Sequence, residues 1–286
     1  MRSGIRKNIK SGIARLTRGQ LMNYAAAIHD QPTPFPAKGP GRYLQVRPDD
    51  TFIVSYPRSG NTWLRFLVAN LVHRGEVVDY GNIETIVPDI YVTNELSLRK
   101  MAGPRILKSH EAYDPRYRRV IYAVRDPRGV IVSQFNTLRR LRGDLVGDSF
   151  EKFVDRQLAG DFDAWFGSWS GNVCSWIHQD KADVELLVVK YEDVRRDTLA
   201  VATRIVEFLG IETSEEELRD AVANSSHGRM RDLYESSSAR LEKAIGEGNA
   251  GHLRPNMASA DPGMTPRIEQ RIRDRYGRVM ASLGYA

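Results

Sequence analysis

The sequence predicts an α/β fold: a single domain in which helices flank both faces of a central parallel β-sheet. Four short apolar segments have the composition of buried strands, at residues 51–55, 105–109, 120–124 and 185–191. Helical patterns lie between and after them, at about residues 61–74, 127–142, 149–158, 163–180 and 196–209. Strands that alternate with helices are typical of βαβ units, whose strands run parallel.

The folded domain is expected to begin after an N-terminal arm. Residues 1–45 contain eight Lys or Arg and one Asp, and residues 31–42 are rich in Pro and Gly, as in a linker. We therefore divide the chain into a basic arm with its linker, residues 1–45, and a domain of residues 46–286. With 286 residues in all, the chain is long enough to bury a large core.

The first strand leads into a loop with the composition of an anion site. Residues 51–55 are mostly apolar, residues 56–60 form a tight loop with Pro and Gly, and apolar residues then recur at helical spacing up to residue 72. A strand, a small-residue loop and a helix N-terminus direct backbone N–H groups at one phosphate-sized anion. Arg58 adds a positive charge beside that site.

This loop differs from the loop that binds nucleoside triphosphates. That motif is G-x-x-x-x-G-K-[ST], whereas Asn61 and Thr62 follow Gly60 in this sequence. The cation stands two residues before the glycine, at Arg58. We therefore predict a cradle for a phosphate-like group that lacks the Lys needed to reach a γ-phosphate.

Polar side chains also follow the second and third strands, at the edge where ligands bind in parallel sheets. Lys108 and His110 end the second strand and offer a cation and a base that titrates near neutral pH. Arg125 ends the third strand, and Asp126 and Pro127 favour a helix that starts at once. The sequence thus predicts a second anion site at Arg125.

Residues 56–63, Tyr-Pro-Arg-Ser-Gly-Asn-Thr-Trp, closely resemble the phosphosulfate-binding loop of sulfotransferases, which is typically Y-P-K-S-G-T-T-W. Arg58 replaces the commoner Lys, which keeps the charge but changes a point donor into a planar fork. The chain is identified as a bacterial-type member of this family over about residues 48–286. The resemblance implies a fold like that of P-loop nucleotide hydrolases and a donor, 3′-phosphoadenosine 5′-phosphosulfate (PAPS), which leaves as adenosine 3′,5′-bisphosphate (PAP). It also implies donor contacts from Arg58, Ser59, Gly60, Asn61, Thr62 and Trp63.

The resemblance also implies catalytic roles after the second strand. Many sulfotransferases carry K-T-H or K-S-H there, so His110 is the expected base that removes the acceptor proton. Lys108 and Arg58 are the expected cations beside the transferring oxygens. Glu111 is the alternative base, because some relatives use a carboxylate.

Further matches concern the adenosine part of the donor. Arg125 and Ser133 correspond to the pair that holds the 3′-phosphate in the family. Tyr191 opens a Y-E-D segment whose Tyr lies near the adenine. Ser226 and His227 fall where the family has a turn spelled roughly T-S-F-x-x-M, so both are expected beside the adenine and the 3′-phosphate, with His227 in place of Phe.

The last family motif, R-K-G-x-x-G-x-W, is only partly present. Its glycine spacing survives at Gly248 and Gly251, but the basic pair is lost and Glu247 stands in its place. A carboxylate beside a phosphate is unfavourable. We expect either that Arg254 and His252 compensate or that this loop folds differently.

Composition limits the other classes of function. The net charge of +6 comes from the arm, since residues 46–286 hold 34 basic and 35 acidic residues, which argues against nucleic acid as a partner. No window approaches 18 apolar residues and no secretory signal is visible. The single cysteine, Cys174, rules out an intramolecular disulfide and suits a reducing cytoplasm, where we expect the protein. No metal is expected, because no ligand cluster has metal-site spacing.

The basic arm is a candidate for peripheral membrane contact at the inner face. Residues 1–30 can form a helix with Ile5, Ile9, Ile13, Leu16 and Leu21 roughly on one side. Such a basic amphipathic helix binds anionic membrane surfaces, and a solvated arm is the alternative.

The predicted reaction is in-line transfer of a sulfuryl group from PAPS to a hydroxyl, with an amine as the second choice. The acceptor is a small molecule, a carbohydrate or a glycolipid, and residues 76–103 and 137–168 are expected to line its site. Trp165, Trp169, Val173 and Trp176 form either a core-facing stripe or an aromatic wall for the acceptor. Two other functions remain open: a nucleotide-dependent kinase on a similar scaffold, and a non-catalytic protein that binds a polyanion or a membrane.

Overall fold

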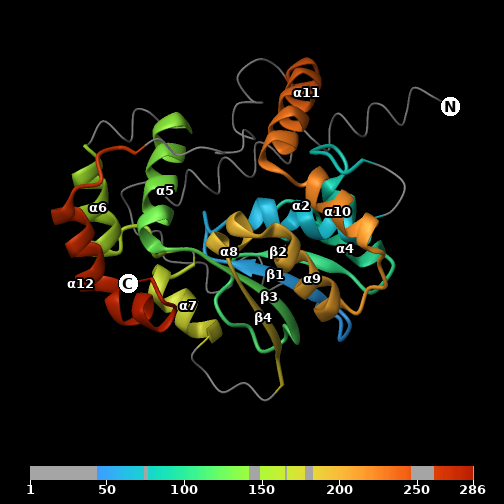
Figure 1. Ribbon diagram of the computed structural model, residues 1–286, viewed down its shortest axis with the longest axis horizontal. Coiled ribbons are helices and arrows are strands. Elements are labelled where there is room, and N and C mark those ends of the chain that lie inside the picture. The colour runs from blue at the N-terminus through green and yellow to red at the C-terminus, as the bar shows by residue number, and fades with distance from the viewer. Residues whose placement is uncertain are drawn as a thin grey trace.

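A four-stranded parallel sheet forms the centre of the computed structural model, which describes residues 44–73, 77–141, 149–164, 166–177, 183–245 and 261–285 (Figure 1). Its strands lie in the order β2-β1-β3-β4. They are β1 (Thr51–Ser55), β2 (Ile106–Ser109), β3 (Arg119–Val124) and β4 (Glu185–Lys190). All three neighbouring pairs are parallel, which confirms the predicted fold class.

The two central strands bury both of their faces. In β1, Phe52 and Val54 belong to one hydrophobic core, whereas Ile53 between them belongs to the other. In β3, Tyr122 and Ile121 divide in the same way, and all five side chains are 0% exposed. Because neighbouring residues of a strand point to opposite faces, a strand covered on both sides reads as a continuous apolar run.

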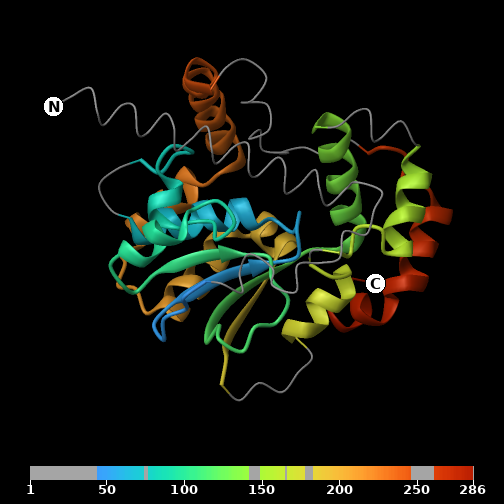
Figure 2. The same ribbon diagram turned by 180° about the vertical axis from the view of Figure 1, so that it is seen from behind.

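Helices cover both faces of the sheet, and Figures 1 and 2 show the two groups from opposite sides. The core that contains Phe52 is completed by α5 (Pro127–Leu141), α6 (Phe150–Ala159), α7 (Trp169–Ile177) and α12 (Pro266–Ser282). The core that contains Ile53 is completed by α2 (Asn61–Val72), α9 (Thr198–Leu209), α10 (Glu215–Asn224) and α11 (His227–Ile245). Three short helices, α3 (Ile83–Ile86), α4 (Glu95–Lys100) and α8 (Tyr191–Arg196), complete the fold.

Local signals set the ends of several helices. In the described part of the pattern over residues 163–180, α7 begins at Trp169, because Gly167 adopts a φ of 72° and the Ser168 hydroxyl accepts a hydrogen bond from the Gly171 N–H at 3.0 Å. Helices α10, α11 and α12 lie beyond residue 209, in a stretch for which no helix is predicted. Ser214 and Glu217 form a capping box at the start of α10, and Pro266 begins α12.

The tryptophan stripe on α7 faces the core. Trp169 is 1% exposed, and Val173 and Trp176 are 0% exposed. The core-facing interpretation is therefore confirmed for these three residues, and Trp165 lies outside the described residues.

The order of the strands creates a switch point between β1 and β3. From β1 the chain continues to β2 at one edge of the sheet, and from β3 it continues to β4 at the opposite edge. Crevices open at such points beyond the carboxyl ends of the strands, and ligands bind there. The loop after β1 and the start of α5 after β3 therefore meet at one place.

No helix within the described ranges is both long and apolar enough to span a bilayer. Residues 1–43, which include nearly all of the predicted arm and linker, lie outside the described residues.

Candidate active site

The loop between β1 and α2 has an unusual backbone shape that turns it toward the crevice. Arg58 has a φ of 70°, which is rare for a residue other than glycine, and Gly60 has a φ of 93°. The first intrahelical hydrogen bond of α2 runs from the Leu64 N–H to the Gly60 carbonyl at 3.1 Å. The preceding N–H groups, at the start of the helix, have no intrahelical acceptor and carry the positive end of the helix dipole.

Three buried polar atoms at this loop lack hydrogen-bond partners among the described residues. One is Asn61 Oδ1, on a side chain that turns into the sheet. The other two are the Ser59 hydroxyl oxygen and the Trp63 indole nitrogen, in residues that are 1% and 7% exposed. Buried polar groups normally have partners, so these two atoms mark a place where a polar ligand fits. A small pocket runs beside them, lined by Ser59, Gly60, Trp63, Leu64, Ala123, Val189, Tyr191 and Val194.

Aromatic rings pack around the loop. The Tyr191 ring lies so close to Gly60 that an added Cβ atom would be 2.5 Å from Cδ2 of the ring. Trp63 meets the Tyr191 ring edge-on with centroids 5.8 Å apart, and meets the His227 ring at 4.0 Å. The first turns of α2, α8 and α11 are thereby brought together beside the loop.

Two guanidinium groups meet at the same loop. Arg58 Nε donates a hydrogen bond to the Ser133 hydroxyl on α5 at 3.1 Å, and Arg125 Nη1 donates to the Arg58 carbonyl at 3.2 Å. The Arg125 guanidinium also lies over the Tyr191 ring, 4.3 Å from its centroid. Burial lowers the pKa of Arg125, because the charged form is partly removed from water. Two partly buried cations at a helix N-terminus fit an anionic ligand.

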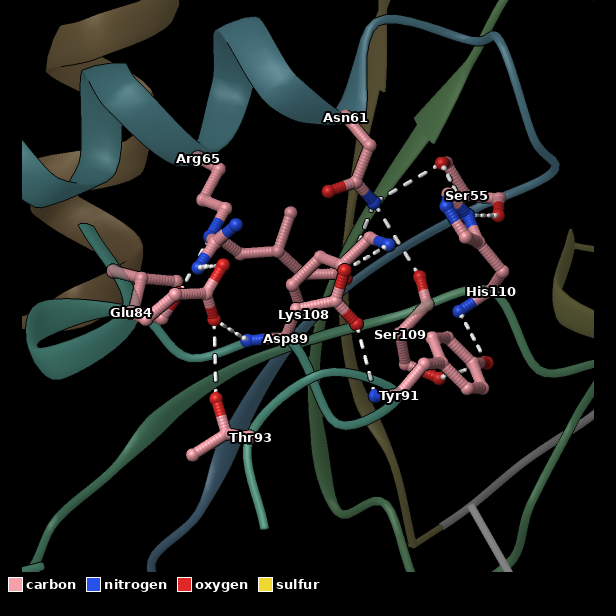
Figure 3. Close-up of polar contacts among 12 residues, drawn as sticks. Ser55, Asn61, Arg65, Glu84, Asp89, Tyr91, Thr93, Lys108, Ser109 and His110 are labelled. Carbon is pink, nitrogen blue, oxygen red and sulfur yellow. Dashed lines mark hydrogen bonds and ion pairs between the residues drawn. The ribbon is translucent and has the colours of Figure 1, made fainter. Parts of the chain in front are cut away.

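The imidazole of His110 is held by the end of β1 (Figure 3). Its Nδ1 atom lies 2.7 Å from the Ser55 carbonyl oxygen and 3.3 Å from the Ser55 hydroxyl. A carbonyl oxygen only accepts hydrogen bonds, so Nδ1 carries the proton and Nε2 keeps its lone pair. Burial, with the charge of Lys108, lowers the pKa of His110 to about 3. The ring is therefore neutral at pH 7, with the Nε2 lone pair available to accept a hydrogen bond.

Two aromatic side chains stand beside His110. The Tyr91 hydroxyl accepts a hydrogen bond from the His110 backbone N–H at 2.9 Å and donates to Glu111 Oε1 at 3.2 Å. The Phe166 ring meets the rings of Tyr91 and His110 edge-on, with centroids 5.6 and 5.5 Å apart. Tyr91 and Phe166 belong to the two segments that are predicted to line the acceptor site.

Lys108 is engaged in a buried network of charges beneath α2 (Figure 3). Its ammonium nitrogen lies 2.7 Å from Asp89 Oδ2, and Arg65 and Glu84 form a neighbouring pair at 2.9 Å. Although burial raises the pKa of Asp89, the charges of Lys108 and Arg65 lower it overall. The positive charge of Lys108 thus lies close enough to act on the His110 ring, while its nitrogen is bound to Asp89.

Helix α7 holds the strand ends in place, a role that the sequence pattern did not predict. The indole nitrogens of Trp169 and Trp176 donate to the carbonyls of Arg125 and Glu111 at 3.1 and 3.0 Å. The Asn172 side chain donates to the His110 carbonyl at 3.2 Å. A buried Asn in an otherwise apolar helical stretch is the signal that points to such a role, because a buried amide needs partners.

The side chains of the other predicted contacts are exposed or lie outside the described residues. Thr62 is exposed on the first turn of α2. Ser226 is also exposed, and its hydroxyl accepts from the Arg229 N–H at 3.4 Å at the start of α11. Gly248, Gly251 and Arg254 lie outside the described residues. Within the described ranges, no group of three or more His, Cys, Asp or Glu side chains is placed to hold a metal ion.

Comparisons with known proteins agree on one family. A model described as "Sulfotransferase domain" matches residues 48–284. Sulfotransferase 1E1 of Bos taurus is 29% identical over 203 residues, which cover 66% of this chain and 68% of the relative. Sulfotransferase 2A2 of Rattus norvegicus is 29% identical over 210 residues, which cover 70% and 73% of the two chains.

Solved structures share the fold. Mouse sulfotransferase SULT7A1, crystallised with PAP, superposes with a TM-score of 0.64 and 23% identity, and covers 83% of this chain and 85% of its own. A retinol dehydratase in complex with androsterone and PAP superposes with a TM-score of 0.56 and 21% identity, and covers 82% of each chain.

Proposed function

This chain belongs to the sulfotransferase domain family, and from that premise we propose that it transfers a sulfuryl group from PAPS to a hydroxyl group of a small molecule. The observation that carries the proposal is a set of hydrogen bonds around the end of β1. Arg58 in the loop bonds to Ser133 and Arg125, and Ser55 at the strand end bonds to His110. A donor site and a neutral base thereby share one strand end.

The donor would be held by groups that need an anionic partner. The N–H groups at the start of α2 and the guanidinium of Arg58 would bind the 5′-phosphosulfate, whose sulfuryl group is the one transferred. Arg125 and Ser133 would bind the 3′-phosphate. The orphaned Ser59 hydroxyl supports this assignment, as does the requirement for glycine at position 60.

The adenine would lie among the three rings of Trp63, Tyr191 and His227. Their packing against one another and against Gly60 supports this assignment. Because Trp63 and His227 are only 4.0 Å apart, the base would stack on an outer face of these rings rather than between them. The exposed Ser226 stays a prediction for the same part of the donor.

His110 would act as the general base. Its Nε2 would take the proton of the acceptor hydroxyl as the new oxygen–sulfur bond forms, while the bond between sulfur and the PAP oxygen breaks. By analogy with phosphoryl transfer, the protein would chiefly align the entering and leaving oxygens and stabilise the spreading negative charge. Arg58 and the N–H groups of the loop would supply that stabilisation, with Lys108 contributing its charge from the ion pair with Asp89.

The acceptor would meet the rings of Tyr91 and Phe166 beside His110. The similarity to a retinol dehydratase that was crystallised with androsterone supports a small molecule as acceptor. An amine, a carbohydrate or a glycolipid stays a prediction. So does contact between residues 1–30 and the inner face of a membrane.

Binding of PAP to the purified protein is the experiment that tests the donor site. At a ligand concentration of about 100 times Kd, the free energy of unfolding should rise by about 2.7 kcal/mol. We expect PAP to raise the melting temperature, and Arg125→Ala to abolish that rise. Arg118→Ala is the matched control, because Arg118 is exposed and distant in sequence from the loop, and its guanidinium lies 4.0 Å from the exposed Asp183 carboxylate.

Parallel measurements separate the alternatives. A rise with ATP and Mg²⁺ and none with PAP would replace the sulfotransferase proposal by a kinase, and no rise with either would favour a binding protein. Transfer of labelled sulfate from PAPS to a panel of alcohols and phenols then tests the reaction. His110→Ala should lower kcat by about 10²–10⁴-fold while PAP affinity is retained.

A further inference from the structure

The side chain of Asn61 turns away from the donor loop and into the sheet. Asn61 is the first residue of α2 and is only 4% exposed. Its Nδ2 atom lies 3.1 Å from the Ser55 hydroxyl, 3.3 Å from the Ser109 carbonyl and 3.4 Å from the Ile53 carbonyl (Figure 3). One amide therefore bridges the carboxyl ends of β1 and β2.

The orientation of this amide follows from its neighbours. Two of the three oxygens are carbonyls, which only accept hydrogen bonds, so the amide nitrogen must face them. The opposite orientation would place Oδ1 against two carbonyl oxygens. In the observed orientation Oδ1 has no hydrogen-bond partner among the described residues. The contacts of Nδ2 are therefore kept although Oδ1 stays unpaired. The Nδ2 contacts thus determine the orientation of the Asn61 side chain.

These contacts begin where the backbone pairing of β1 and β2 ends. The last paired residues are Val54 and Ser109. Beyond that point, His110 Nδ1 bonds to the Ser55 carbonyl and Asn61 Nδ2 bonds to the Ser109 carbonyl. The imidazole and the amide thus link the two strands by side-chain hydrogen bonds beyond the last backbone pair. Both side chains also contact the Ser55 hydroxyl.

We propose that Asn61 is a positioning residue for His110: its amide fixes the spacing of the two strand ends and the place of the Ser55 side chain, and so directs Nε2 of His110 at the acceptor. The backbone N–H of Asn61 serves the donor at the helix start, while its side chain serves the base. The proposal rests on the proposed function, because it assigns His110 the role of base.

Asn61→Leu tests this role, since it keeps nearly the same volume and removes the donor. We expect kcat to fall by up to about 10²-fold, because small displacements of a catalytic group have effects of that size. The affinity for PAP should be unchanged. Ser55→Ala removes the hydroxyl that both side chains touch, and should lower kcat in the same direction with PAP affinity retained. If Asn61→Leu does not fold, Ser55→Ala still tests the side chain through which Asn61 is proposed to act, and an unchanged kcat would overturn the proposal.

Asn70→Ala is the matched control. Asn70 lies on the same helix, and its amide donates to the Phe66 carbonyl of that helix at 2.9 Å. It should leave kcat and PAP affinity unchanged.

Imidazole ¹⁵N spectra of His110 provide a readout independent of turnover. The wild type should show the form protonated at Nδ1, and Asn61→Leu should show a mixture of the two neutral forms. A parallel loss of PAP affinity and kcat would overturn the proposal, because it would make the Asn61 side chain a donor ligand. Unchanged spectra would also overturn it. If the wild type binds PAP but transfers sulfate to no acceptor, the proposed function fails, and the spectra and PAP affinities of the variants still decide the role of Asn61.

Discussion

The side-chain amide of Asn172 on α7 donates a hydrogen bond to the carbonyl oxygen of His110, with the two atoms 3.2 Å apart. The same amide nitrogen lies 3.1 Å from the Phe166 carbonyl, and its oxygen accepts from the Tyr122 hydroxyl at 2.8 Å. Asn172 is 0% exposed, so all of these groups depend on one another rather than on water. One residue thus links the candidate base, an aromatic neighbour of that base and a central strand.

Asn172→Leu should destabilise the protein, because it leaves the Tyr122 hydroxyl and two carbonyls without this partner. Each buried group left unsatisfied costs about 1–3 kcal/mol. Urea unfolding measures the loss. The double variant Asn172→Leu/Tyr122→Phe should lose less than the sum of the two single variants, since it also removes the hydroxyl that lost this acceptor. Strictly additive losses would show that the two side chains are not coupled.

Gly60→Ala should abolish PAP binding. Position 60 combines a φ of 93° with a Tyr191 carbon only 2.5 Å from the site of an added Cβ, so the loop or the ring must move. Gly210→Ala is the matched control, because Gly210 has a φ of 67° but no atom within 4 Å of the added Cβ. It should show only the cost of the left-handed backbone, about 1–2 kcal/mol, with PAP affinity retained. Equal PAP affinity in the two variants would contradict the close packing of Tyr191 on the loop.

His110 should stay neutral far below the usual range for histidine. Burial and the charge of Lys108 lower its pKa to about 3, so its imidazole signals should not titrate between pH 8 and about 4. Spectra of His110→Gln identify which signals belong to this residue. Titration of the wild-type ring near pH 6.5 would show that the imidazole is open to water and would contradict the buried contact with Ser55.

The same shift predicts how stability changes with pH. A histidine whose pKa is lower in the folded state binds more protons when unfolded, so its contribution to stability is complete above about pH 6.5 and is lost as the pH falls toward about 3. The free energy of unfolding of the wild type should therefore decline over this range more steeply than that of His110→Gln. Parallel curves for the two proteins would argue against the shift.

Arg105 and Asp50 form an ion pair that anchors the start of the domain to β2. Their side chains are 1% and 0% exposed, and Arg105 Nε lies 2.7 Å from Asp50 Oδ1. Removing either partner leaves a buried charge, so Asp50→Ala and Arg105→Ala should each cost about 3–5 kcal/mol. Glu215→Ala, which breaks an exposed pair with Arg219, should cost at most about 1 kcal/mol. Chemical denaturation of the three variants compares them directly.

Much of the fold was predictable because its signals are local. The apolar runs of β1 and β3 identify strands buried on both faces, and the apolar spacing after residue 61 identifies α2. Helix α12 was not predicted, although Thr265 and Pro266 mark its start. Its buried apolar residues, Ile268, Ile272, Tyr276 and Met280, recur every four positions among many charged ones, so they share one face of the helix. That face packs against α5, α6 and α7, and the local signal for this helix was present in the sequence.

The candidate site was predictable where residues follow strand ends. Arg58, His110 and Arg125 were predicted in this way, and contacts through Ser55, Ser133 and the loop carbonyl join them. Ser55, Tyr91 and Asn172 were not predicted. Their roles come from hydrogen bonds to residues distant in the chain, and no local pattern indicates those partners. Lys108 was predicted as a cation for the donor, and its ion pair with Asp89 depends on a segment 19 residues earlier in the chain.

The sequence by itself determined the class of the fold, the loop that suits an anion, and the cations and candidate base at the strand ends. Each of these depends on residues close together in the chain. Only the tertiary structure decided the state of those groups. The tautomer of His110 depends on a carbonyl 55 residues away, and its lowered pKa depends on burial. The direction of the Asn61 side chain depends on oxygens from two strands. Hydrogen-bond partners and removal from water are set by the packing of distant segments, and no local pattern in the chain encodes them.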